Sequence, residues 1–117
     1  MNIIIYHNPR CSKSRKTLEL IRGNGIEPRI IEYLEDPPDA ATTSRLAALL
    51  GVPVSGLLRS SETDFTEARD LPPLDDNAAL ARWIEKHPIV LQRPIVVDAD
   101  RDQAVIGRPP ERVLELL

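Results

Sequence analysis

The chain of 117 residues contains a single cysteine, Cys11. One thiol excludes an internal disulfide and a zinc site built mainly from cysteines. The sequence also lacks any apolar run near the roughly 20 residues that a membrane-spanning helix needs. Its first residues, Met1–Ile5, have neither the basic nor the long apolar region of a secretory signal peptide. We therefore expect a cytoplasmic protein with no membrane partner, in which the free thiol stays reduced.

Basic residues are fewer than acidic ones, 15 against 18, and the net charge is −3. This balance argues against nucleic acid as the main partner. The basic residues are unevenly placed, because the first 18 residues hold four of them and no acidic residue: Arg10, Lys13, Arg15 and Lys16. The lone cysteine thus lies inside the one strongly basic stretch.

The first third of the chain predicts a βαβ unit. β-branched and aromatic residues indicate strands at 3–6 and 29–34. Between them, a helix is expected from Ser12 to about Arg22, because an apolar face recurs at helical spacing and the Gly23–Gly25 segment ends it. The face that we expect to be buried comprises Thr17, Leu18 and Ile21.

A helical insert at about 39–87 is expected to follow. One helix is predicted from a cap at Asp39 to Leu50, and another from a cap at Asp75 or Asp76 to Lys86. A short helical turn is expected at 54–58, and residues 60–75 are given no element.

The last third returns to strands and gives the order βαβ, insert, ββα. A hairpin is predicted from strands at 95–97 and 104–106, and a final helix begins at 107–111. Its expected core face comprises Val113, Leu114 and Leu117. With no linker or repeat, residues 1–117 are predicted to form a single α/β domain.

Cys11 falls where the first strand meets the first helix. The first amides of a helix have no partner within the helix, and the helix dipole places partial positive charge there. A cysteine at this point gains thiolate character and can lie beside a bound anion. A buried structural cysteine is the alternative, but the polar neighbours Arg10, Ser12, Lys13 and Ser14 favour a reactive thiol.

The spacing around Cys11 separates two kinds of thiol site. A low-molecular-weight tyrosine phosphatase loop needs five residues between cysteine and arginine, whereas three separate Cys11 from Arg15. A dithiol motif needs a second cysteine at position 14, where Ser14 stands. A site with one thiol must be reduced by an external thiol.

Three further arginines lie at predicted strand or helix ends: Arg59, Arg93 and Arg108. Each is suited to hold an oxyanion through its planar guanidinium, and a solvated surface position is the alternative for each. His7 can raise the positive potential at Cys11, orient the thiolate or form a hydrogen bond within its own loop. His87 is expected to be structural.

Six motifs resemble the glutaredoxin-linked arsenate reductase family, and in particular its short subfamily. They span most of the chain in order: residues 6–15 around Cys11, 32–34, 57–59, 87–89, 93–97 and 107–111. The resemblance implies a thioredoxin-like fold with Cys11 as nucleophile and His7 near the thiol. It implies a cis peptide bond before Pro94. It also implies the oxyanion-binding residues, which are Arg59, Arg93 and Arg108, with Ser14 and Arg15 beside them.

The activity that the resemblance implies is reduction of arsenate to arsenite, with glutathione as co-substrate and glutaredoxin as partner. It requires no metal and no bound cofactor. One alternative is a monothiol oxidoreductase of glutaredoxin type without arsenate activity, which leaves the three arginines unexplained. A second is a regulator resembling Spx that binds RNA polymerase, although Ser14 removes the dithiol switch that such regulators often carry.

Overall fold

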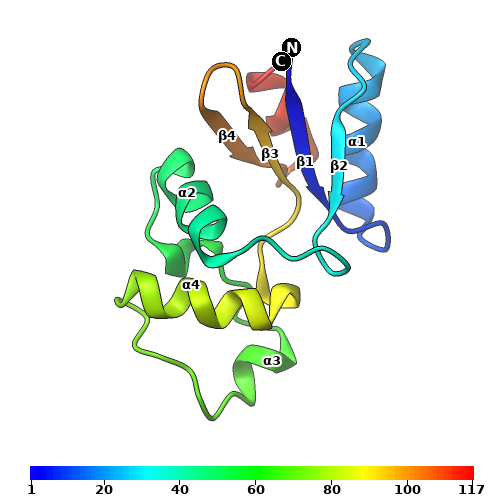
Figure 1. Cartoon of the computed structure of the whole chain (residues 1–117). Helices are drawn as coiled ribbons and strands as arrows, with labels where there is room; N and C mark the ends of the chain where they lie inside the picture. The colour runs from blue at the N-terminus through cyan, green and yellow to red at the C-terminus, as the bar shows by residue number, and fades with distance from the viewer. The chain divides into compact units, whose positions relative to one another are not determined.

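The structure is a computed structural model that describes all 117 residues, and it divides into two compact units (Figure 1). The first unit comprises residues 1–36 and 93–117, and it holds the whole sheet. The second comprises residues 37–92 and is mainly helical. None of the helices combines the length and apolar character needed to cross a membrane.

The first unit is built on a four-stranded mixed sheet of order β2-β1-β3-β4. Its strands are β1 (Ile3–His7), β2 (Arg29–Glu32), β3 (Ile95–Asp98) and β4 (Gln103–Ile106). β1 pairs in parallel with β2 and antiparallel with β3, and β3 pairs antiparallel with β4. The helix α1 (Ser12–Gly23) connects β1 to β2. This arrangement confirms the predicted α/β class and the thioredoxin-like order of elements.

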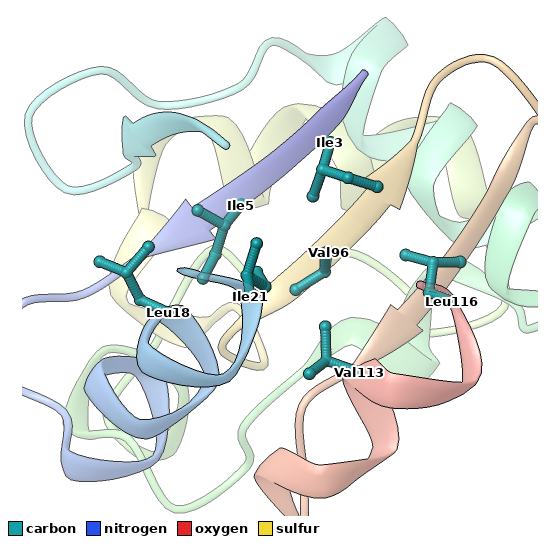
Figure 2. Packing of buried hydrophobic residues seen from close by; sticks show 7 residues of the cluster. All are labelled: Ile3, Ile5, Leu18, Ile21, Val96, Val113 and Leu116. Atoms are coloured by element: carbon teal, nitrogen blue, oxygen red, sulfur yellow. The ribbon is translucent and has the colours of Figure 1, made fainter. Parts of the chain in front are cut away.

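The core of the first unit lies between the sheet and two helices on one of its faces (Figure 2). The strands contribute side chains that alternate along β1, as the two-residue period of a strand requires. The helix α1 contributes Leu18 and Ile21, which were predicted to be buried. The cluster consists of Ile3, Ile5, Leu18, Ile21, Val96, Val113 and Leu116.

The last helix, η3 (Pro110–Glu115), is a 3₁₀ helix, and this changes the face that it buries. Val113 is fully buried and Leu116 is 3% exposed, whereas Leu114 is 44% exposed. A 3₁₀ helix has three residues per turn, so residues 113 and 116 share a face. The prediction that Leu114 belongs to the core face is therefore wrong, and that for Val113 is confirmed.

The second unit contains the two predicted helices, α2 (Ala40–Leu50) and α4 (Asn77–Lys86). The Asp39 side chain accepts a hydrogen bond from the Thr42 amide at 2.8 Å, and Asp76 caps α4 in the same way. Gly51 ends α2 in the left-handed conformation, with φ of 70°. The predicted starts of both helices are confirmed. They were predictable because a capping side chain acts only on residues next to it in the sequence.

Three short helices complete the second unit: η1 (Val54–Leu57), α3 (Thr63–Thr66) and η2 (Pro88–Val90). α3 falls within the segment 60–75, to which the sequence assigned no element. The ends of η1 and η2 are joined by backbone hydrogen bonds, including one from the Arg59 amide to the Val90 carbonyl at 2.6 Å. This bond fixes the backbone from which the Arg59 side chain extends.

Candidate active site

Cys11 occupies the N-cap position of α1, in the loop that follows β1. Its amide donates to the Asn8 carbonyl at 3.0 Å, and its carbonyl accepts from the Arg15 amide at 3.0 Å. A side chain at the N-cap faces the amides of the second and third helical residues, here Lys13 and Ser14. The thiol is partly exposed, so the structure places an accessible sulfur at the positive end of α1.

Ser14 ties this loop together from the inside. It is fully buried, and its Oγ lies 2.6 Å from His7 Nδ1 and accepts a hydrogen bond from the Asn8 amide at 3.0 Å. Arg15 also contacts its own loop, because its Nη1 donates to the Pro9 carbonyl at 3.0 Å. Both residues were predicted to bind an oxyanion; in the structure their side chains hold the loop that carries Cys11.

Arg108 brings a guanidinium to the sulfur of Cys11. Its Nη2 lies 3.8 Å from Cys11 Sγ, and its Nε donates to the Arg93 carbonyl at 2.8 Å. The second bond fixes the plane of the guanidinium and leaves its charge uncancelled, because a carbonyl is neutral. Arg93 lies two residues before β3, and both Arg93–Pro94 and Arg108–Pro109 are cis peptide bonds. The structure thus brings two of the three predicted arginines to Cys11.

Gly107 allows this approach of Arg108, and sequence reasoning did not place it in the site. A Cβ at this position would lie 2.6 Å from Thr17 Oγ1 and 2.8 Å from Pro94 Cγ. The Gly107 amide donates to the Pro94 carbonyl at 2.9 Å. Only glycine fits between α1 and the start of β3 without displacing one of them. The available signal was a glycine next to an arginine at a strand end.

Asn8 is a second residue that the sequence did not single out. It is 7% exposed, and its Oδ1 accepts a hydrogen bond from the Arg10 amide at 3.0 Å. An asparagine that bonds the backbone two residues on stabilises a tight turn. The signal was the Asn8–Pro9 pair, which is typical of turns.

The surroundings of Cys11 favour its thiolate. Burial raises the pKa of the thiol, but the backbone amides of Ser14 and Lys13 lower it. The side chain of Arg93 and the charge of Arg108 lower it further. Together these groups outweigh burial, so that the pKa of Cys11 lies below the ordinary value of a cysteine.

His7 is buried, at 6% exposed, and this determines its charge state. Burial lowers the pKa of His7; Glu32 raises it, Arg22 and Arg15 lower it, and the net direction is downward. An imidazole that is neutral near pH 7 adds no positive charge to the Cys11 loop. The geometry favours the hydrogen-bonding role among those considered for His7.

Arg59, the third predicted arginine, belongs to the second unit. Its Nη1 lies 3.7 Å from a carboxylate oxygen of Glu62, and both side chains are only about one fifth exposed, at 22% and 20%. The ion pair spans one turn at the start of α3. Arg59 therefore has a carboxylate as its neighbour, unlike Arg108.

The donor set at this site does not resemble a metal centre. No group of three or more histidine, cysteine, aspartate or glutamate side chains is arranged to hold a metal ion anywhere in the chain. The groups that converge on Cys11 are amides and guanidinium groups, which are hydrogen-bond donors and suit an anion.

A sheet of this order with a cysteine at the N-terminus of its first helix defines a thioredoxin-like protein with a single free thiol. The ArsC family model matches residues 6–116. The chain therefore belongs to the ArsC family.

The relatives of the chain cover nearly all of it. The Escherichia coli K12 protein YfgD, described as uncharacterized, is 45% identical over 97% of this chain and 94% of its own length. An arsenate reductase of Haemophilus influenzae is 40% identical over the full length of both chains. The solved structure of an arsenate reductase from Vibrio cholerae is 43% identical and has a TM-score of 0.87 over 100% of this chain and 98% of that one.

Proposed function

We propose that this protein reduces arsenate to arsenite with Cys11 as the nucleophile. The observation that carries the proposal is the position of Arg108 Nη2, 3.8 Å from Cys11 Sγ at the start of α1. A guanidinium at this place stabilises a thiolate and attracts an anion to the same point. Membership in the ArsC family and the full-length similarity to an arsenate reductase select arsenate as the anion.

Arsenate is bound by donors whose charge it complements. The guanidinium groups of Arg93 and Arg108 and the free amides of α1 form hydrogen bonds with its oxygens. We assign Arg59 the same role from the family resemblance. Fixed positive charge lowers the barrier because negative charge builds up around arsenic during attack.

The thiolate of Cys11 then attacks arsenic(V). A sulfur–arsenic bond forms, and one arsenate oxygen leaves as water after protonation. The thiolate of glutathione attacks the sulfur of Cys11, and the electron pair of the sulfur–arsenic bond stays on arsenic. Arsenic is thereby reduced to arsenic(III), and the two thiols are oxidised to a mixed disulfide. Arsenite leaves the site.

The mixed disulfide must be resolved from outside, because Cys11 is the only cysteine. We propose glutaredoxin as this reductant, since it acts on disulfides between a protein and glutathione. The chemistry uses two thiols and one oxyanion, and the proposal includes no metal or bound cofactor.

The test is an arsenate-dependent assay with glutathione, glutaredoxin, glutathione reductase and NADPH, using the wild type and Cys11→Ser. We expect NADPH oxidation that depends on arsenate and on all components and is lost in the variant. Turnover with thioredoxin alone would contradict the glutathione-dependent route. A matched reaction without arsenate, with a glutathionylated protein as substrate, tests the glutaredoxin-type alternative. Activity only in that reaction would favour the alternative.

A further inference from the structure

A cavity of about 190 Å³ opens beside the loop that carries Cys11. It lies in the first unit, between the residues that follow β1 and those that follow β2. Because these strands are parallel and His7 pairs with Glu32 at their ends, the two loops leave the sheet side by side (Figure 1). The lining includes Pro9 and Arg10, the two residues directly before Cys11. No other residue of the loop therefore separates the cavity from the thiol-bearing residue.

The cavity is lined by charges of both signs that do not neutralise one another. Arg10 supplies a guanidinium, and Glu32 and Glu35 supply carboxylates. All three side chains are exposed, and no ion pair joins Arg10 to either glutamate. A ligand that carries an ammonium and a carboxylate close together complements both signs at once.

Glutathione has such a pair of groups at one end only. Its γ-glutamyl end carries an α-ammonium and an α-carboxylate on the same carbon, whereas its glycyl end carries a carboxylate alone. The cysteinyl sulfur lies on the next residue, and two extended residues span about 7 Å. The Cα atoms of consecutive residues, such as Arg10 and Cys11, are about 3.8 Å apart. The sulfur can thus reach Cys11 while the γ-glutamyl end stays in the cavity.

We propose that this cavity is the subsite for the γ-glutamyl end of glutathione, with Arg10 holding its carboxylate and Glu35 its ammonium. This inference rests on the proposed function, in which glutathione attacks the sulfur of Cys11. It assigns a contact with the co-substrate to Arg10, for which the sequence indicated only a basic neighbourhood. It also fixes the direction in which the tripeptide binds, because carboxylate side chains in the cavity repel the glycyl end.

The test compares thiols that carry the γ-glutamyl end with one that lacks it. Glutathione and γ-glutamylcysteine have this end, whereas N-acetylcysteinylglycine has an acetyl group in its place; all three carry the same net charge. The readout is the rate at which the disulfide-linked dimer of each thiol forms a mixed disulfide with Cys11, followed by mass spectrometry. In this exchange the Cys11 thiolate attacks one sulfur of the dimer and the other sulfur leaves as a thiolate, so that no arsenate is needed.

The variants are Arg10→Gln and Glu35→Gln. Each should slow the exchange with the two γ-glutamyl disulfides by about fivefold more than the exchange with the N-acetyl disulfide. The N-acetyl disulfide measures any effect on the thiol itself, which the comparison then removes. For Glu35→Gln, loss of a negative charge would by itself favour an anionic disulfide, so slower exchange identifies a contact with the ammonium. Glu35 is the better position to test, because Glu32 also raises the pKa of His7.

The matched controls are Arg29→Gln and Glu115→Gln, at exposed positions of the same unit outside the cavity. They should leave the ratios between the three exchange rates unchanged. Arg10→Gln and Glu35→Gln proteins with unchanged ratios would overturn the inference and leave the proposed function intact. A wild type without arsenate turnover would instead overturn the proposed function, and the exchange rates would still decide whether the cavity holds the γ-glutamyl end.

Discussion

Arg108 in the first unit and Arg59 in the second have opposite kinds of neighbour. Arg108 donates to a neutral carbonyl of Arg93 at 2.8 Å and reaches the sulfur of Cys11. Arg59 lies 3.7 Å from the carboxylate of Glu62. A carbonyl orients a guanidinium without opposing its charge, whereas a carboxylate offsets part of that charge. The same residue type thus has a neutral partner in one place and an anionic partner in the other.

The histidines differ in the same way between the two units. His7 is buried, and its Nδ1 lies 2.6 Å from the Ser14 hydroxyl. His87 is partly exposed, stacks on Trp83 and lies 3.1 Å from the Asp64 carboxylate. Arg108 and His7 near Cys11 therefore have neutral partners, whereas Arg59 and His87 of the helical unit pair with carboxylates. Substitutions in the first setting should have the larger effects.

The largest effect is expected for Cys11→Ser. A serine hydroxyl at this N-cap keeps the loop, but it is not ionised near pH 7 and cannot take up the oxidised state. We expect at least about a thousandfold loss of arsenate reduction, with a melting temperature close to that of the wild type. Residual activity above one tenth of the wild type would remove Cys11 from the mechanism.

A smaller loss is expected for Arg108→Lys. Lysine keeps the charge but cannot bond both the Arg93 carbonyl and the sulfur. We expect kcat/KM for arsenate to fall about ten- to a hundredfold. Because the lysine charge is no longer held beside the sulfur by the Arg93 carbonyl, the pKa of Cys11 should rise, and alkylation should require a higher pH.

The control for Arg108 is Arg112→Lys, at an exposed position on η3. It should leave both the kinetics and the alkylation profile unchanged. If the two substitutions had equal effects, the position of Arg108 beside the sulfur would have no functional meaning.

Ser14→Ala is expected to act mainly on stability. It removes the partner of the buried His7 ring nitrogen and of the buried Asn8 amide. Leaving such groups unsatisfied should lower the free energy of unfolding by about 2 kcal/mol, measured by urea denaturation. Ser12→Ala, at an exposed position in the same turn, should change it far less. Equal losses would show that the hydroxyl of Ser14 has no special structural role.

Much of the fold was predictable because its signals are local. The strand β1, the caps of α2 and α4 and the glycine that ends α2 each depend on a few adjacent residues. The buried face of η3 could not be predicted in this way, because the spacing of Val113, Leu114 and Leu117 fits an α helix. In the structure Val113 and Leu116 of a 3₁₀ helix pack against α1 instead, and this contact between distant segments is not visible in the local spacing.

The residues of the candidate site also differ in whether local sequence could reveal their position. The place of Cys11 follows from a strand that meets a helix, which the sequence reveals directly. Arg108 is 97 residues away. Its position at a predicted strand end made it a candidate, but no spacing in the sequence shows that it meets Cys11.

The smallest effect, and one of opposite sign, is expected for Glu62→Gln. If Glu62 cancels part of the charge of Arg59, the amide should leave more of that charge for the anion. Partly exposed ion pairs contribute up to about 1 kcal/mol, so KM for arsenate should fall by about two- to fivefold. Glu67→Gln, at an exposed position after α3, controls for the general loss of a negative charge. A Glu62→Gln protein with unchanged or higher KM would mean that Glu62 orients Arg59 instead of competing with the anion. Arg59 and Arg108 would then both be held by a fixed partner, and the contrast between them would disappear.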